Sequence, residues 1–101
     1  MFSLPKLIAQ LTLHEGLELL PYTDTTGHIT IGYGRNLTDV GISKAEADFL
    51  LQSDIERTVR GLDRELPWWR GLNDVRQRVM IDLAYNLGLG EYGKSGLLSF
   101  V

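Results

Sequence analysis

The chain has 101 residues and a formal net charge of −3, with 44% hydrophobic residues, 23% charged residues and no cysteine. The apolar fraction is ordinary for a globular domain and excludes a disordered chain, and the length fits one domain with a thin core. Without cysteine there are no disulfides, cysteine nucleophiles or thiolate metal sites, and the acidic balance argues against nucleic acid as a partner. Because residues 1–6 lack the features of a signal peptide and no apolar run approaches the roughly 20 residues of a membrane span, we expect a soluble protein without a membrane anchor.

The first predicted element is a helix that begins after Ser3. Ser3 is a good N-cap, and Pro5 is tolerated in the first turn because the amide hydrogen that it lacks would have no helical partner. A stripe of apolar residues at helical spacing supports this helix: Leu4, Leu7, Ile8 and Leu11. Gly16 is the natural stop signal, although residues 17–20 could extend the helix by another turn before Pro21.

The hydrophobic period then changes from helical to alternating. Residues 23–27 form a cluster of turn-forming residues, and residues 28–33 alternate between apolar and polar side chains. In a strand this alternation puts Ile29 and Ile31 on one apolar face and Thr30 on the other face. We therefore predict a small antiparallel hairpin or three-stranded sheet, with the Thr30 methyl group outside the core.

Two more helices are predicted in the second half of the chain. Residues 43–46 form a Ser-Lys-Ala-Glu capping box, which opens a long helix that Pro67 stops. Asn73 can cap a further helix over residues 74–87, which Gly88 closes. This helix is apolar on almost every side, which is typical of a helix buried all round. The predicted fold class is α+β, with the sheet and the helices in separate parts of the chain.

Three polar residues could carry chemistry: Glu15 at the end of the first helix, Asp24 in the turn cluster and Thr30 in the strand. A carboxyl group in the last turn of a helix faces the negative end of the helix dipole, which favours the protonated form that can donate a proton to a leaving oxygen. Asp24, among hydroxyls and free amide groups, should stay ionised. Glycoside cleavage requires such a pair of carboxyl groups, and the Thr30 hydroxyl could hold the attacking water. Taken singly, each also fits an ordinary role as a solvated helix residue, a turn former or a strand former.

The remaining candidates have simpler interpretations. Neither His14 nor His28 has a partner at metal-ligand spacing, so we expect no metal site and no cofactor. The Gly-Tyr-Gly triplet at residues 32–34 lacks the helix N-terminus that would hold a phosphate. Trp68 and Trp69 could stack on a sugar ring, but covering a thin core is the simpler role.

Taken whole, the pattern closely resembles a known family. The segments His14-Glu15-Gly16, Pro21-Tyr22-Thr23-Asp24 and Gly27-His28-Ile29-Thr30-Ile31-Gly32-Tyr33-Gly34 resemble the phage-type lysozymes, the T4 lysozyme family of glycoside hydrolases. Residues 75–88 also resemble the central helix of that family's second lobe. The resemblance implies cleavage of the β-1,4 bond between N-acetylmuramic acid and N-acetylglucosamine in peptidoglycan. It implies that Glu15 is the acid, Asp24 the charged helper and Thr30 the holder of the water. Its implied substrate-binding residues are Tyr85, Asn86 and Asn36.

The resemblance also implies a domain organisation. Residues 1–101 would form one lysozyme-like domain, in which residues 16–60 form the sheet-containing lobe with the start of the long helix. Residues 61–101 and residues 1–15 would form an incomplete helical lobe, because the second lobe of the family continues for several more helices. The apolar surface then left uncovered leads us to expect self-association, or binding of a complementing chain, through residues 74–101.

Several alternatives stay open at this level. The chain could be a catalytically silent remnant, or an assembly module that works only with a partner chain. Retention or inversion of the anomeric configuration also stays open, because it depends on the separation of the two carboxyl groups. For an active enzyme, the resemblance implies that it waits in the host cytoplasm and reaches the cell wall after the membrane is permeabilised.

Overall fold

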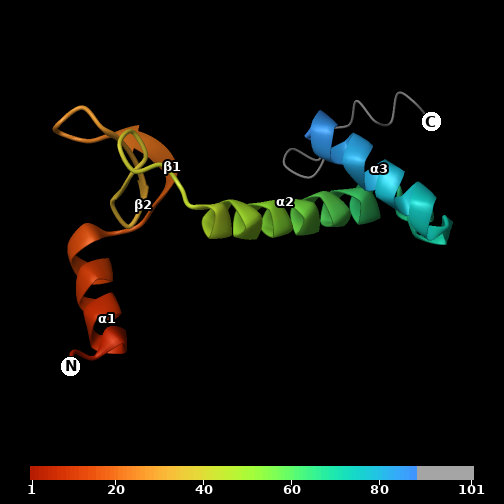
Figure 1. Ribbon diagram of the computed structural model, residues 1–101. Helices are drawn as coiled ribbons and strands as arrows, with labels where there is room; N and C mark the ends of the chain where they lie inside the picture. Colours follow the sequence, from red (N-terminus) through yellow and green to blue (C-terminus); the bar gives the residue numbers. More distant parts are fainter. Residues whose placement is uncertain (89–101) are drawn as a thin grey trace. The chain divides into compact units, whose positions relative to one another are not determined.

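The computed structural model describes residues 1–88, which form three α-helices, three strands and a short 3-10 helix (Figure 1). In chain order these are α1 (Leu4–Glu15), β1 (Glu18–Thr23), β2 (Ile29–Gly32), β3 (Arg35–Asn36), α2 (Lys44–Glu65), η1 (Pro67–Gly71) and α3 (Asp74–Leu87). The structure divides into two compact units, Met1–Ser43 and Lys44–Val101. The α+β fold class is confirmed, and this division places α1 in the same unit as the sheet.

Helix α1 begins and ends where the sequence predicts. The Ser3 hydroxyl caps the first turn, and Gly16 closes the helix by donating its N–H to the Thr12 carbonyl at 3.1 Å. Gly16 has a φ of 71°, a conformation that glycine adopts without the steric cost of a Cβ. The alternative of a helical extension through residues 17–20 is wrong, because the chain leaves the helix at Gly16 and enters β1 at Glu18.

The strands form one antiparallel sheet in the order β1-β2-β3, which confirms the three-stranded alternative. In the β1–β2 pair, Glu18 lies opposite Gly32 and Tyr22 lies opposite Thr30, with an irregular register between these two pairs. Pro21 belongs to this irregular stretch of an edge strand, where its missing N–H leaves no ladder hydrogen bond unmade. Pro21 therefore lies inside a strand and does not mark the end of a helix.

The two faces of β2 are covered in the opposite way to the prediction. Thr30 is only 4% exposed, whereas Ile29 is 49% exposed. The expectation that the Thr30 methyl group lies outside the core is therefore wrong. Alternation in the sequence determines which residues share a face of a strand, but the packing of the rest of the chain decides which face is covered.

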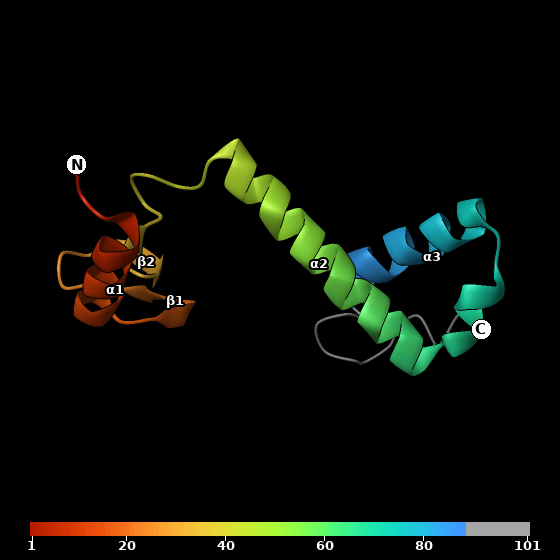
Figure 2. The ribbon, with the colours of Figure 1, turned by 90° about the horizontal axis from the view of Figure 1, so that it is seen from below.

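Helix α2 begins directly after Ser43 and ends shortly before Pro67, as predicted. Its apolar residues are buried only toward the C-terminal end, where Leu62 is buried together with Leu66 just after the helix, whereas Leu51 is half-exposed. The buried apolar residues of the described chain form one cluster in the second unit: Leu62, Leu66, Trp69 and Ala84, with Val59, Leu72, Met80 and Ile81 packed against them. Figures 1 and 2 both show α3 lying beside α2. Helix α2 contacts both α3 and η1, and the core lies where these three elements pack together.

A polar cluster fixes η1 to the end of α2. The Asp63 carboxylate accepts hydrogen bonds from Trp69 Nε1 at 2.8 Å and from Arg70 Nε and Nη2 at 2.8 and 2.9 Å. The Arg70 guanidinium also lies over the Trp69 ring, 4.6 Å from its centroid. These hydrogen bonds lower the pKa of Asp63 from 3.8 to about 2, and the bonds from Arg70 have the largest effect. Trp69 is thus a core residue, as the simpler interpretation has it, while Trp68 is half-exposed.

Helix α3 has the predicted bounds but not the predicted burial. Asn73 Oδ1 accepts the first-turn hydrogen bond from the Arg76 N–H at 2.9 Å, and Gly88 ends the helix in the left-handed region at φ 74°. The expectation of burial all round is wrong: only Ala84 is buried, and Val79 is 59% exposed. The physical reason is that α3 packs against α2 and η1, and this packing leaves Val75 and Val79 exposed. Within residues 1–88, no helix combines the length and apolar character needed to cross a membrane.

Candidate active site

Glu15 is the last residue of α1, and its carboxyl group lies against the turn that joins β2 to β3. Glu15 Oε2 is 3.0 Å from the place that a Cβ on Gly34 would occupy, and the Glu15 carboxyl carbon is 3.5 Å from it. Gly34 has a φ of 84°. Among the described residues, no side chain forms a hydrogen bond or an ion pair with this exposed carboxyl group. The group is therefore free to exchange a proton with a substrate.

Asp24 stands in the turn between β1 and β2 with one carboxylate oxygen fully engaged. Its Oδ1 accepts hydrogen bonds from the Thr26 N–H at 2.9 Å, the Thr26 hydroxyl at 2.8 Å and the His28 N–H at 2.9 Å. The His28 N–H is the largest cause of a lowered pKa at Asp24, followed by the Thr26 hydroxyl. Oδ2 accepts no hydrogen bond from any residue that the structure describes. Asp24 is thus an oriented anion, as expected, with one oxygen left to face a ligand.

The structure brings Asp24 and Thr30 together through a single backbone oxygen. The His28 carbonyl accepts a hydrogen bond from the Asp24 N–H at 2.8 Å and another from the Thr30 hydroxyl at 3.2 Å. Because the Thr30 hydroxyl gives its proton to this carbonyl, its oxygen lone pairs stay available to accept a hydrogen bond from water. The relative placement of the charged group and the hydroxyl is therefore fixed by the strand-turn geometry around His28.

Asn36, one of the three substrate-binding residues that the resemblance implies, lies in the first unit and is engaged with a neighbour. Its Nδ2 donates to Asp39 Oδ2 at 3.0 Å, and its Oδ1 accepts from the Asp39 N–H at 3.0 Å. Asn36 therefore closes the turn after β3. Its carbonyl and amide groups are both used within the protein.

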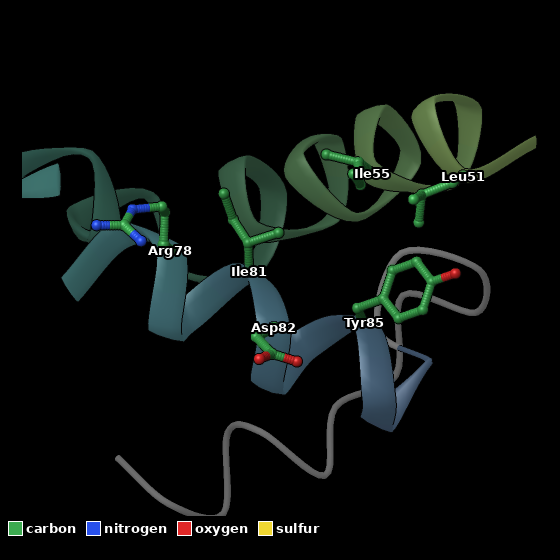
Figure 3. Close-up of a pocket in the computed structure, with 6 residues that line it drawn as sticks. All are labelled: Leu51, Ile55, Arg78, Ile81, Asp82 and Tyr85. Atoms are coloured by element: carbon green, nitrogen blue, oxygen red, sulfur yellow. The ribbon is translucent and has the colours of Figure 1, made fainter. Parts of the chain in front are cut away.

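Tyr85 and Asn86 lie in the second unit, on α3. Tyr85 is 40% exposed and lines a mainly apolar groove of about 420 Å³ between α2 and α3, where its ring lies near Leu51 (Figure 3). The lining residues are Leu51, Ile55, Arg78, Ile81, Asp82 and Tyr85. The Asn86 amide donates to the carbonyl and the carboxylate of Asp82 within the same helix. Tyr85 thus presents an open aromatic face, whereas the Asn86 side chain is tied to its own helix.

Sequence reasoning missed two residues of this site, His28 and Gly34. Asp, Thr and His at positions 24, 26 and 28 follow the spacing of a turn in which an aspartate bonds to the backbone two and four residues later, and this signal could have found His28. Gly34 carried no comparable signal, because its role depends on the approach of the distant Glu15. The described residues contain no group of three or more His, Cys, Asp or Glu that could hold a metal ion.

Comparison with known proteins identifies the family. The phage lysozyme family model matches residues 12–101. The chain belongs to the phage lysozyme family. It is 32% identical over 93 residues to an endolysin of Bacillus phage PZA and 35% identical over 96 residues to an endolysin of Bacillus phage B103. Each match covers 86% of this chain and 35% of the relative, so the chain spans about a third of the length of these curated relatives. The resemblance of the Glu15, Asp24 and Thr30 segments to phage-type lysozymes is therefore confirmed at the level of the family.

Proposed function

We propose that this chain carries the catalytic groups of a peptidoglycan hydrolase that cleaves the β-1,4 bond between N-acetylmuramic acid and N-acetylglucosamine during bacterial lysis by a phage. Family membership and the endolysin relatives support the substrate class. The observation that carries the proposal is the contrast between the two carboxyl groups. Asp24 is held as an oriented anion by three hydrogen bonds, while Glu15 is exposed and without a hydrogen-bond partner among residues 1–88.

This contrast supports a division of labour in the cleavage. The Glu15 carboxyl group donates its proton to the glycosidic oxygen, and the bond from that oxygen to the sugar C1 breaks. The Asp24 carboxylate opposes the positive charge that develops on the sugar ring. Water positioned by the Thr30 hydroxyl completes the hydrolysis, and its proton restores the acid. Tyr85, in the second unit, offers an aromatic surface on which a sugar ring would pack.

In this role the enzyme would act on the cell wall from the host cytoplasm once the membrane is permeabilised.

The test of the proposed function is a Glu15→Gln substitution, which preserves the shape of the side chain and removes the transferable proton. We expect turbidity clearing of permeabilised Gram-negative cells to fall by at least about a hundredfold, because general acid catalysis contributes on that scale. Glu18→Gln is the matched control, since Glu18 is also an exposed glutamate of the first unit and begins β1.

The bond cleaved is read from the products. Purified peptidoglycan is digested, the new reducing ends are reduced with borohydride, and the fragments are weighed by mass spectrometry. Fragments ending in reduced N-acetylmuramic acid support the proposal. Fragments ending in reduced N-acetylglucosamine, or full activity in Glu15→Gln protein with an unchanged fold, contradict it.

A further inference from the structure

The His28 side chain occupies an unusual position beside the Asp24 carboxylate. Its Nδ1 is 2.6 Å from the Thr26 hydroxyl, and its Nε2 is 3.2 Å from Asp39 Oδ2. The Asp24 carboxylate also faces the ring, with Oδ1 3.8 Å from Nδ1. The imidazole therefore lies between two carboxylates and contacts a hydroxyl that is itself bonded to Asp24.

The directions of the hydrogen bonds around the ring favour one protonation state of His28. A Thr26 hydroxyl has one proton, and an ionised Asp24 can only accept, so that proton belongs to the 2.8 Å bond from Thr26 Oγ1 to Asp24 Oδ1. The 2.6 Å contact then requires His28 Nδ1 to donate to Thr26 Oγ1. A proton on Nε2 as well makes the 3.2 Å contact with Asp39 Oδ2 attractive, since two acceptors would repel each other. All the contacts are satisfied together only by the doubly protonated ring.

We propose that His28, as its imidazolium, is the positioning residue of the candidate site: it orients the Asp24 carboxylate through the Thr26 hydroxyl and is anchored by Asp39. This inference rests on the proposed function, because it concerns the carboxylate that opposes charge on the sugar. The backbone carbonyl of His28 also accepts hydrogen bonds from the Asp24 N–H and the Thr30 hydroxyl. The main chain of His28 therefore positions both residues, while its side chain acts on Asp24 alone.

Loss of the second proton must break one of the two side-chain links. If Nδ1 loses its proton, it becomes an acceptor and draws the Thr26 proton away from Asp24. If Nε2 loses its proton, the attraction to Asp39 is replaced by repulsion. The orientation of Asp24 therefore depends on which protons the His28 ring carries.

Two substitutions separate the roles of the two ring nitrogens. His28→Asn places an amide nitrogen near the position of Nδ1 and keeps a donor for Thr26, whereas His28→Gln places one near Nε2 and keeps only the link to Asp39. We expect His28→Gln to lower kcat about tenfold with KM little changed, and His28→Asn to restore most of that loss, because small misplacements of a catalytic group are costly. Asp48→Asn, on the exposed surface of α2, is the control for an unrelated acidic residue.

An NMR measurement tests the inference without any activity. In the full 101-residue chain, long-range ¹H–¹⁵N spectra report the protonation of each His28 nitrogen, and the Asp24 ¹³Cγ shift reports its carboxylate. Both nitrogens protonated in mild acid, with the Asp24 signal responding to His28 titration and not in Thr26→Val protein, support the proposal. An unprotonated Nδ1 throughout, or equal kcat in His28→Gln and wild-type protein, overturns it. If the wild-type chain cleaves no peptidoglycan, the proposed function fails while the NMR result still decides the positioning of Asp24.

Discussion

The Glu15 carboxyl group lies close to Gly34: Glu15 Oε2 is 3.0 Å from the position that a Cβ at Gly34 would occupy. A Cβ at position 34 would require the Glu15 carboxyl group to give by a few tenths of an ångström, and the φ of 84° at Gly34 would strain any such residue in addition. The turn after β2 thus borders the candidate acid. The two effects, displacement of Glu15 and backbone strain, can be separated by experiment.

Gly34→Ala should lower activity more than its effect on stability explains. The backbone strain of an alanine at positive φ costs about 1–2 kcal/mol in the free energy of unfolding. Gly41→Ala is the matched control, since Gly41 has a φ of 63° and nothing within 4 Å of its Cβ position. We expect similar losses of stability in thermal unfolding, and a loss of activity per folded molecule in Gly34→Ala alone. Equal activities in the two variants would show that Glu15 tolerates the displacement.

Substitutions at Thr30 should separate its hydroxyl from its bulk. Thr30 is 4% exposed and its hydroxyl donates to the His28 carbonyl, so Thr30→Ala should cost about 1–2 kcal/mol in stability as well as activity. Thr30→Ser keeps the hydroxyl and should retain most of the activity per folded molecule. Thr30→Val keeps the bulk and should lose it. Hydrolysis rates and chemical unfolding of all three variants test this, and an active Thr30→Val protein would remove the hydroxyl from the mechanism.

The Asp63 cluster should make the second unit sensitive to strong acid. The pKa of Asp63 is about 2 in the folded chain, below its ordinary value of 3.8, because Arg70 and Trp69 donate hydrogen bonds to the charged form. A lowered folded pKa stabilises the protein fully above about pH 4, and this contribution is lost as the pH falls toward 2. Tryptophan fluorescence during acid titration follows the transition. Asp63→Asn should be less stable at neutral pH and lose this part of the acid dependence, whereas Asp74→Asn, which removes an exposed ion pair with Arg78, should match the wild type.

A stripe of exposed apolar residues on α3 supports the prediction that the chain self-associates. Val75, Val79 and Leu83 follow one another at helical spacing and are 58%, 59% and 38% exposed. Residues 89–101, the rest of the predicted surface, lie outside the described residues. We expect the chain to form dimers or larger species at micromolar concentration, and Val79→Glu to shift it toward the monomer with little loss of stability, since apolar patches of this kind favour association. Analytical ultracentrifugation gives the result, and a cooperative wild-type monomer would refute the prediction.

The ends of the helices were determined by the sequence itself. Ser3, Gly16, Asn73 and Gly88 act on backbone groups within a few residues of themselves, so their effect does not depend on the rest of the fold. The same holds for the turn at Asp24, whose carboxylate bonds to residues two and four positions later. Local hydrogen-bonding chemistry of this kind can be derived from the order of the residues alone.

Burial and the contacts of the candidate site were decided only by the tertiary structure. The pattern of β2 placed Thr30 and Ile29 on opposite faces but could not tell which face would be covered. The apolar composition of α3 likewise did not reveal that Val75 and Val79 would stay exposed. The contact of Glu15 with Gly34 joins positions 19 residues apart and requires α1 to end beside the turn after β2. Such relationships depend on how the elements pack, because the free energy of burial belongs to pairs of surfaces and not to a single segment of sequence.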